Sequence, residues 1–178
     1  MRDEWVRPKP GAEGTRRDAM GAALILLGAF ISFLLYTRVG MFPEPAPLWL
    51  SLLSIALVTL PLSLRRRFPS AVAVVVAAGF FLAGQTAVPE ALFVSIGLFI
   101  ALYSVGAWEQ DRRLAMLTRV GITLAMFAWI TVNLIRLTNE PENMPGLSRS
   151  GLFSELASWS AIQVFTNLLY FGAAFYFG

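Results

Sequence analysis

The residues best suited to chemistry in this sequence are four polar side chains close to its carboxyl end. They are Ser160, Gln163, Asn167 and Tyr170. Spacings of three, four and three residues place them along one face of a helix, and we name this set the polar seam. Such a face can pair with another helix, line a wet cavity or form hydrogen bonds across a dimer. Packing inside a bundle is the simplest role, since each such bond contributes roughly 1 kcal/mol or less.

Three other polar residues lie near the ends of apolar stretches, namely Gln85, Asn133 and Arg136. The long side chain of Arg136 is expected to reach lipid headgroups or to pair with a nearby glutamate. These residues do not form a row of carboxylates along an apolar stretch. The sequence therefore predicts neither a proton relay nor an ion path.

The usual catalytic groups are missing from the sequence. It contains no cysteine, which excludes disulfides and thiolate metal sites, and no histidine to act as a base or as a phosphoacceptor. It also has no glycine-rich phosphate loop followed by a lysine and a hydroxyl residue. We therefore predict no catalytic residue, no metal site and no cofactor within this chain.

Composition indicates the environment in which the chain folds. Hydrophobic residues make up 57% of it, charged residues 14%, and the mean hydropathy is +0.66. A soluble domain of 178 residues cannot bury that many apolar side chains, whereas a bilayer accepts them on the outer surface. The charges gather between long apolar stretches, so the net charge of +3 indicates membrane topology rather than nucleic-acid binding.

Six apolar stretches have the length of membrane helices. They cover residues 19–37, 48–64, 70–87, 91–108, 114–137 and 152–177. Each is close to the ~20 residues that cross a hydrocarbon core of ~30 Å. The sequence thus predicts an all-α polytopic membrane protein, with six transmembrane helices in residues 19–178. Residues 1–18 combine five basic residues with prolines and glycines, and are expected to form a basic cytoplasmic leader.

The basic residues predict the orientation in the membrane. With the amino terminus inside, the inner segments carry eleven basic residues and the outer segments carry three. Basic loops stay on the cytoplasmic side, so both termini are expected in the cytoplasm of a multi-pass protein of the plasma membrane. Five inner arginines are assigned to topology and to lipid headgroups: Arg65, Arg66, Arg67, Arg112 and Arg113.

Two details of the helical stretches can be tested by a structure. The turn at Val88-Pro89-Glu90 is so short that the third and fourth helices should form a tight antiparallel hairpin. The alternative topology merges these two helices into one re-entrant hairpin, which would give five spans only if one of the two failed to cross. Small residues four apart allow close helix approach, as at Gly28 and Ser32, Ala73 and Ala77, and Gly97 and Ala101.

Two stretches of the sequence resemble a known family. Residues 45–69 read PAPLWLSLLSIALVTLPLSLRRRFP, and residues 83–113 read AGQTAVPEALFVSIGLFIALYSVGAWEQDRR. Both resemble the amino-terminal membrane region of actinobacterial sensor histidine kinases, which signal to response regulators of the NarL type. The resemblance extends more loosely to the remaining apolar stretches.

The resemblance implies a kinase domain that lies outside these 178 residues. In that family the last membrane helix continues into a dimerisation helix with the phosphorylated histidine, followed by an ATP-binding domain. The resemblance therefore implies a homodimer, ATP and Mg²⁺ in the missing kinase domain, and contact with a response regulator only through that domain. We expect this chain to be a fragment or a truncated relative that is inactive alone.

The sequence leaves three functional readings. The first is a sensor module, whose signal would be received within or close to the membrane because the outer loops are short. The second is a small transporter-like protein, which would need broken helices, an inverted repeat or charges inside the membrane. The third is an anchor or scaffold without a signal of its own. We favour the sensor because of the resemblance.

Overall fold

The described part of the chain is entirely helical. The computed structural model describes residues 11–40, 42, 44–139 and 155–177, and within them there are six α-helices, one 3₁₀-helix and no strand. The helices are α1 (Ala12–Val39), α2 (Leu48–Thr59), η1 (Leu60–Leu64), α3 (Pro69–Gln85), α4 (Leu92–Trp108), α5 (Arg112–Asn139) and α6 (Glu155–Phe177). The predicted all-α class is confirmed.

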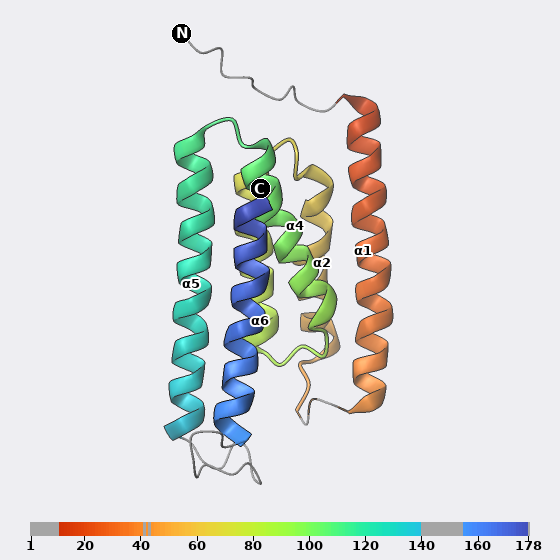
Figure 1. Ribbon diagram of the computed structural model, residues 1–178. Coiled ribbons are helices and arrows are strands. Elements are labelled where there is room, and N and C mark those ends of the chain that lie inside the picture. Colours follow the sequence, from red (N-terminus) through yellow and green to blue (C-terminus); the bar gives the residue numbers. More distant parts are fainter. Residues whose placement is uncertain (1–10, 41, 43, 140–154, 178) are drawn as a thin grey trace.

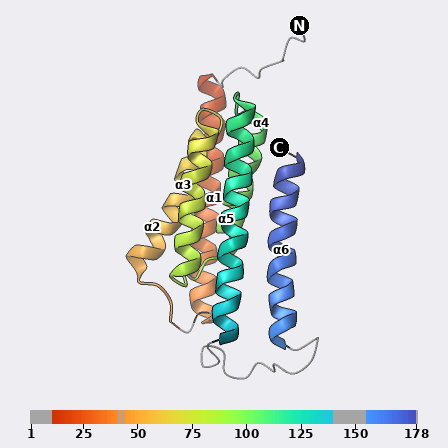
Figure 2. The same ribbon diagram turned by 90° about the vertical axis from the view of Figure 1, so that its left-hand side faces the viewer.

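Successive helices run up and down the bundle. In Figure 1, α1 begins at the upper end, where η1 passes into α3 and α4 passes into α5, and α6 finishes towards the same end. Figure 2 shows α6 at one edge of the bundle and α2 at the opposite edge. The first and last helices therefore begin and finish at a common end.

The first helix begins earlier than the apolar pattern predicted. Its first residue is Ala12 rather than Ala19, so the later part of the expected leader is helical. Glu13 and Arg17 form an ion pair of 2.6 Å along the helix surface, at the four-residue spacing that favours helix formation. Apolar periodicity cannot show this first turn because its side chains are polar.

Proline divides the second predicted helix. The stretch predicted as one helix over 48–64 is α-helical to Thr59 and then continues as the 3₁₀-helix η1. Pro61 lacks the N–H that an α-helix would require at this place, and the tighter 3₁₀ turn accommodates that loss. The same geometry brings Arg65 and Arg66, which follow η1, round towards α1.

The centre of the bundle is formed by α2, α3 and α4, which pack closely on one another. Val58, Val76 and Val105 are fully buried there. A Cβ atom added to Gly97 of α4 would lie 2.4 Å from Cγ1 of Val58, so only glycine permits this approach of α4 to α2. The predicted close approach at a small residue is confirmed at Gly97, and Ala73 of α3 is fully buried.

The turn between α3 and α4 forms the predicted tight hairpin. Ala87 has a positive φ of 52°, and its carbonyl accepts the amide of Ala46 from the loop before α2. The buried carboxylate of Glu90 accepts the amides of Phe93 and Val94, both at 2.8 Å, and so caps the start of α4. This capping holds the short turn in a single conformation.

The outward surface of the bundle is apolar. Large hydrophobic side chains are exposed on every α-helix, including Leu24 on α1 (68%), Leu117 on α5 (71%) and Leu169 on α6 (72%). Two helical stretches, Ala12–Val39 and Arg112–Asn133, are long and apolar enough to span a membrane. The segment Leu48–Leu64, α3 and α4 are shorter apolar helices. Length and composition therefore associate at least two helices with a membrane.

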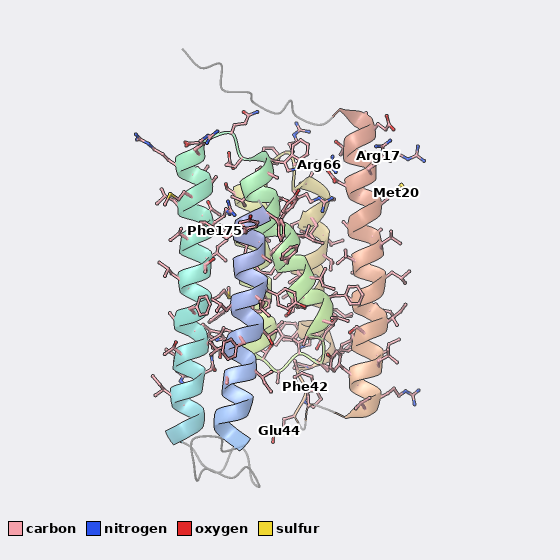
Figure 3. The ribbon with its side chains drawn as sticks, in the orientation of Figure 1. Arg17, Met20, Phe42, Glu44, Arg66 and Phe175 are labelled. Carbon is pink, nitrogen blue, oxygen red and sulfur yellow. The ribbon has the colours of Figure 1, made fainter. Side chains whose placement is uncertain are left out.

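Basic residues concentrate at one end of the bundle, which we call the basic end. The described arginines there are Arg16, Arg17, Arg65, Arg66, Arg67, Arg112, Arg113 and Arg119, whereas Arg38 and Arg136 lie towards the other end. Figure 3 shows Arg17 and Arg66 near the basic end, and Phe42 and Glu44 at the opposite end. The up-and-down order of the helices thus gathers charges that are far apart in the sequence.

We predict that Gly97→Ala destabilises the fold by about 1–3 kcal/mol, because its new methyl group overlaps Val58. Thermal unfolding of the purified chain in detergent, followed by circular dichroism, measures the loss. Adding Val58→Ala should make the double variant more stable than the two separate losses imply. The control Gly121→Ala, which has open space around it, should lose no stability. Equal losses for Gly97→Ala and Gly121→Ala would contradict the close approach of α4 and α2.

Candidate functional site

A buried carboxylate organises the basic end. Asp18 of α1 is only 2% exposed. Its Oδ1 accepts hydrogen bonds from Arg65, at 3.2 Å from Nε and 3.0 Å from Nη2, and its Oδ2 lies 3.0 Å from Nε of Arg66. We call these three residues the Asp18 cluster. Two guanidinium groups on one carboxylate leave this cluster with a net positive charge.

The Asp18 cluster joins elements that are distant in the sequence. Asp18 comes from α1, and both arginines come from the turn after η1, which packs against α1. A carboxylate withdrawn from water is costly unless it is paired and hydrogen-bonded. The paired arginines meet that condition, so the cluster fixes the position of α1 beside η1.

A second group of contacts extends the cluster to α4. The guanidinium of Arg66 lies 4.9 Å from the centroid of the Trp108 ring, at cation–π distance. The next residue, Glu109, accepts a hydrogen bond of 2.5 Å from the hydroxyl of Ser70 at the start of α3. The basic end therefore links α1, α3 and α4 through charged and aromatic side chains.

A pocket of about 280 Å³ opens between the turn from η1 to α3 and the connection from α4 to α5, and we call it the basic-end pocket. It is lined by Arg66, Arg67, Phe68, Pro69, Ser70, Ala71, Trp108, Glu109, Gln110 and Leu114. The lining combines two guanidinium groups with one carboxylate and with aromatic rings. Such a mixture suits a small ligand that carries both signs of charge.

A different arginine holds the end of α6. Arg119 of α5 donates a hydrogen bond of 3.0 Å to the carbonyl of Ala174 and another from the same nitrogen to the carbonyl of Phe175. Its guanidinium also lies 4.2 Å from the centroid of the Phe175 ring. Figure 3 shows Phe175 towards the basic end, between α5 and α6. A guanidinium group that donates to two backbone carbonyls joins the two helices, so Arg119 ties α5 to α6 at Ala174 and Phe175.

Only part of the polar seam lies within the described residues. Tyr170 is half-buried, and its ring meets that of Phe99 of α4 edge to face at 6.5 Å. These two residues, with Thr166, Leu169 and Ala173, line a largely apolar groove of about 390 Å³ between α4 and α6. The side chains of the other three seam residues, Ser160, Gln163 and Asn167, lie outside the described residues. The seam as a unit therefore stays a prediction.

The arginines assigned to headgroups divide into two groups. Arg65 and Arg66 turn towards Asp18 and are 26% and 28% exposed. Arg67 is exposed beside the Phe68 ring, and Arg112 and Arg113 are exposed at the start of α5. Contact of these side chains with lipid stays a prediction, and binding to Asp18 is an additional role that the sequence did not indicate.

The other polar residues singled out from the sequence lie apart from the basic end. Gln85 is exposed at the end of α3, and Arg136 is exposed near the end of α5. Asn133 donates a hydrogen bond of 2.8 Å to the carbonyl of Trp129 one turn earlier. The described residues contain no group of three or more side chains suited to hold a metal ion.

Sequence reasoning missed Asp18, Glu109 and Arg119 as site residues. Asp18 was counted in the leader, although an acid at the very edge of an apolar stretch must find a partner once the helix packs. Arg119 lies one turn inside an apolar stretch, and that position is itself a signal of a polar contact. Glu109 carries no comparable signal, because its partner Ser70 is distant in the sequence.

We predict that Asp18→Asn lowers the free energy of unfolding by about 2–3 kcal/mol, because it leaves two inward-turned guanidinium groups without their carboxylate. This loss is smaller than that for a fully buried ion pair, because the side chains of both arginines are about one-quarter exposed to solvent. Chemical unfolding in detergent measures the loss.

The matched control is Glu13→Gln, which removes an exposed carboxylate from its pair with Arg17 in the same helix. Little change is expected, because exposed ion pairs contribute little to stability. If Asp18→Asn were as stable as Glu13→Gln, the Asp18 cluster would not hold α1 in place.

Comparison with known proteins gives one match. The sequence model of a family described as a domain of unknown function (DUF7134) matches residues 3–168. The match spans α1 to α5 and the first part of α6. No curated protein matches the chain, and no solved structure matches it.

Proposed function

Because the chain belongs to the family DUF7134, whose description assigns no activity, we propose a function from its geometry and its resemblance. The chain is the membrane-embedded input domain of a two-component sensor histidine kinase. It receives a signal in or near the bilayer and passes it on through the basic end of α6. The observation that carries this proposal is the contact of Arg119 of α5 with the backbone of α6 at Ala174 and Phe175, at the basic end.

The apolar exterior supports a multi-pass arrangement. Exposed leucine, valine, methionine and phenylalanine side chains occur on all six α-helices, whereas water-soluble bundles keep one polar face on each helix. The arginines at one end agree with the positive-inside rule. In this proposal the six helices cross the plasma membrane, and the basic end lies in the cytoplasm.

The position of α6 supports its role as the output element. The most closely packed helices are α2, α3 and α4, whereas α6 lies at the edge of the bundle (Figure 2) and adds Ala174 to the buried core. Its contact with α4 includes the apolar groove beside Tyr170, and Arg119 donates to its backbone at Ala174. A shift of α6 therefore disturbs the central helices little, and it moves the segment around Ala174 that lies at the basic end.

The chemistry of the kinase belongs outside this chain. The sequence has no histidine to accept a phosphoryl group. In the proposed function, a following kinase domain of a homodimer binds ATP and Mg²⁺ and passes the phosphoryl group to a response regulator. The residues described above receive and transmit the signal without taking part in phosphoryl transfer.

We predict the topology from single cysteines, which are specific labels because the natural chain has none. Glu44→Cys and Ala91→Cys should react with a membrane-impermeant maleimide on intact cells. Thr15→Cys and Gln110→Cys, at the basic end, should react only after the cells are opened. All four residues are exposed, so folding should not block labelling in either case.

The same labelling distinguishes the six-span topology from the alternative with a re-entrant hairpin. If Ala91→Cys reacts only from the cytoplasmic side while Glu44→Cys reacts from outside, α3 and α4 form a re-entrant hairpin and the six-span proposal is wrong. Outside labelling at Thr15→Cys would reverse the proposed orientation.

We predict that Arg119→Gln changes signalling by the complete product of the gene that encodes this chain. Reconstituted in vesicles, that product should incorporate phosphate from ATP, and the variant should change the rate by about fivefold or more, as expected for typical coupling energies. Arg113→Gln, an exposed arginine one helix turn and a half away, is the matched control and should leave the rate unchanged.

Two outcomes would contradict the proposal. A complete gene product that incorporates no phosphate from ATP, alone or with proteins encoded beside it, would rule out the kinase input domain. Equal rates for Arg119→Gln and the natural protein would rule out the end of α6 as the output element.

A further inference from the structure

The basic-end pocket presents separate positive and negative sides. Arg66 and Arg67 supply guanidinium groups from the turn between η1 and α3, and Glu109 supplies a carboxylate from the residue that follows α4. Arg66 stacks on the Trp108 ring, whereas Glu109 is held by the hydroxyl of Ser70. A ligand that fills this pocket must therefore satisfy both signs.

The positive side carries more charge than Asp18 balances. Arg66 approaches Asp18 through Nε at 3.0 Å, and its side chain is 28% exposed, so part of its guanidinium group faces the pocket that it lines. The single negative charge of Asp18 neutralises only one of the two positive charges of Arg65 and Arg66, and Arg67 adds a further exposed positive charge. Guanidinium groups in such a position match the paired oxygens of a phosphate.

The negative side retains acceptor capacity. Glu109 accepts the Ser70 hydroxyl at Oε2 and the Gln110 amide at Oε1, at 2.5 and 3.1 Å. A carboxylate has about four acceptor positions, so two remain for the N–H groups of an ammonium ion. A phosphate diester without a cation would instead meet repulsion from Glu109.

The size and rim of the pocket indicate how the ligand enters. Its volume of about 280 Å³ lies at the low end for small-molecule sites, which suits a headgroup without its acyl chains. Phe68 and Leu114, which also line it, are 52% and 44% exposed. These apolar side chains offer a path along which acyl chains can leave the pocket towards the surrounding hydrocarbon.

We propose that the basic-end pocket binds the headgroup of a phospholipid that carries a phosphate next to a primary ammonium, as in phosphatidylethanolamine. The phosphate lies by Arg66 and Arg67, and the ammonium lies by Glu109. This inference rests on the membrane location in the proposed function and adds to it the lipid class that the basic end recognises.

The test is native mass spectrometry of the purified chain, released from vesicles with equal amounts of phosphatidylethanolamine, phosphatidylglycerol and phosphatidylcholine. The natural chain should retain phosphatidylethanolamine over the other two lipids. Glu109→Gln should lower that retention by about tenfold, the lower range for one hydrogen bond to a charged group, and should leave phosphatidylglycerol unchanged or increased. Arg67→Gln should lower the retention of phosphatidylethanolamine and of phosphatidylglycerol, since both lipids carry the phosphate.

Matched controls keep the result specific. Glu13→Gln and Arg113→Gln remove one charge of each sign from exposed positions at the same end, outside the pocket, and should not change retention. Unchanged phosphatidylglycerol retention by Glu109→Gln also shows that this variant is folded.

Three outcomes would overturn the inference. The first is equal retention of all three lipids, and the second is unchanged retention of phosphatidylethanolamine by Glu109→Gln. The third is displacement of phosphatidylethanolamine by equimolar phosphoethanolamine or inorganic phosphate, because this would assign the pocket to a soluble ligand. The cysteine labelling tests the membrane location independently. If only the lipid assignment is wrong, the labelling pattern stays as predicted.

Discussion

The arrangement at the basic end depends on one interaction, the pairing of the buried Asp18 carboxylate with two arginines. A charge withdrawn from water requires compensation, and here the compensation comes from the turn after η1 rather than from α1 itself. Because Arg66 meets both Asp18 and the Trp108 ring, the position of α1 is linked to that of α4. Arg66 also lines the pocket beside Glu109, so the same pairing places one wall of that pocket.

The central helices follow a different principle, which is close contact between small and β-branched residues. Gly97 admits Val58, and Gly28 similarly admits the ring of Phe93 where α1 crosses α4. Such contacts need no charge and tolerate little change, because neighbouring atoms already touch. The bundle thus combines a tightly packed centre with a polar junction at one end and with α6, which depends on fewer contacts.

Much of the fold could be predicted because the lengths of the apolar stretches and the positions of the prolines determine local structure. The six helices and the hairpin at Pro89 follow from such signals. The earlier start at Ala12 and the 3₁₀ turn at Pro61 were not predicted, since a hydropathy pattern contains no information about polar helical turns or about the pitch of an apolar helix. The site was predicted less well. Arg66 was recognised as important by its charge, but its partner Asp18 is 48 positions away in the sequence, and only packing brings them together.

The 3₁₀-helix also increases the length of the apolar segment Leu48–Leu64. A 3₁₀ turn rises about 2.0 Å per residue against about 1.5 Å in an α-helix, so α2 and η1 together extend to about 28 Å. The neighbouring α3, which also has 17 residues, extends to only about 25 Å. In the proposed six-span topology, a hydrocarbon layer of about 30 Å exceeds the length of the α3–α4 hairpin by about one helical turn, whereas α2 with η1 nearly matches it. In that topology the lipids beside the hairpin would thin, so the two sides of the bundle would respond differently to bilayer thickness although their helices look alike in composition.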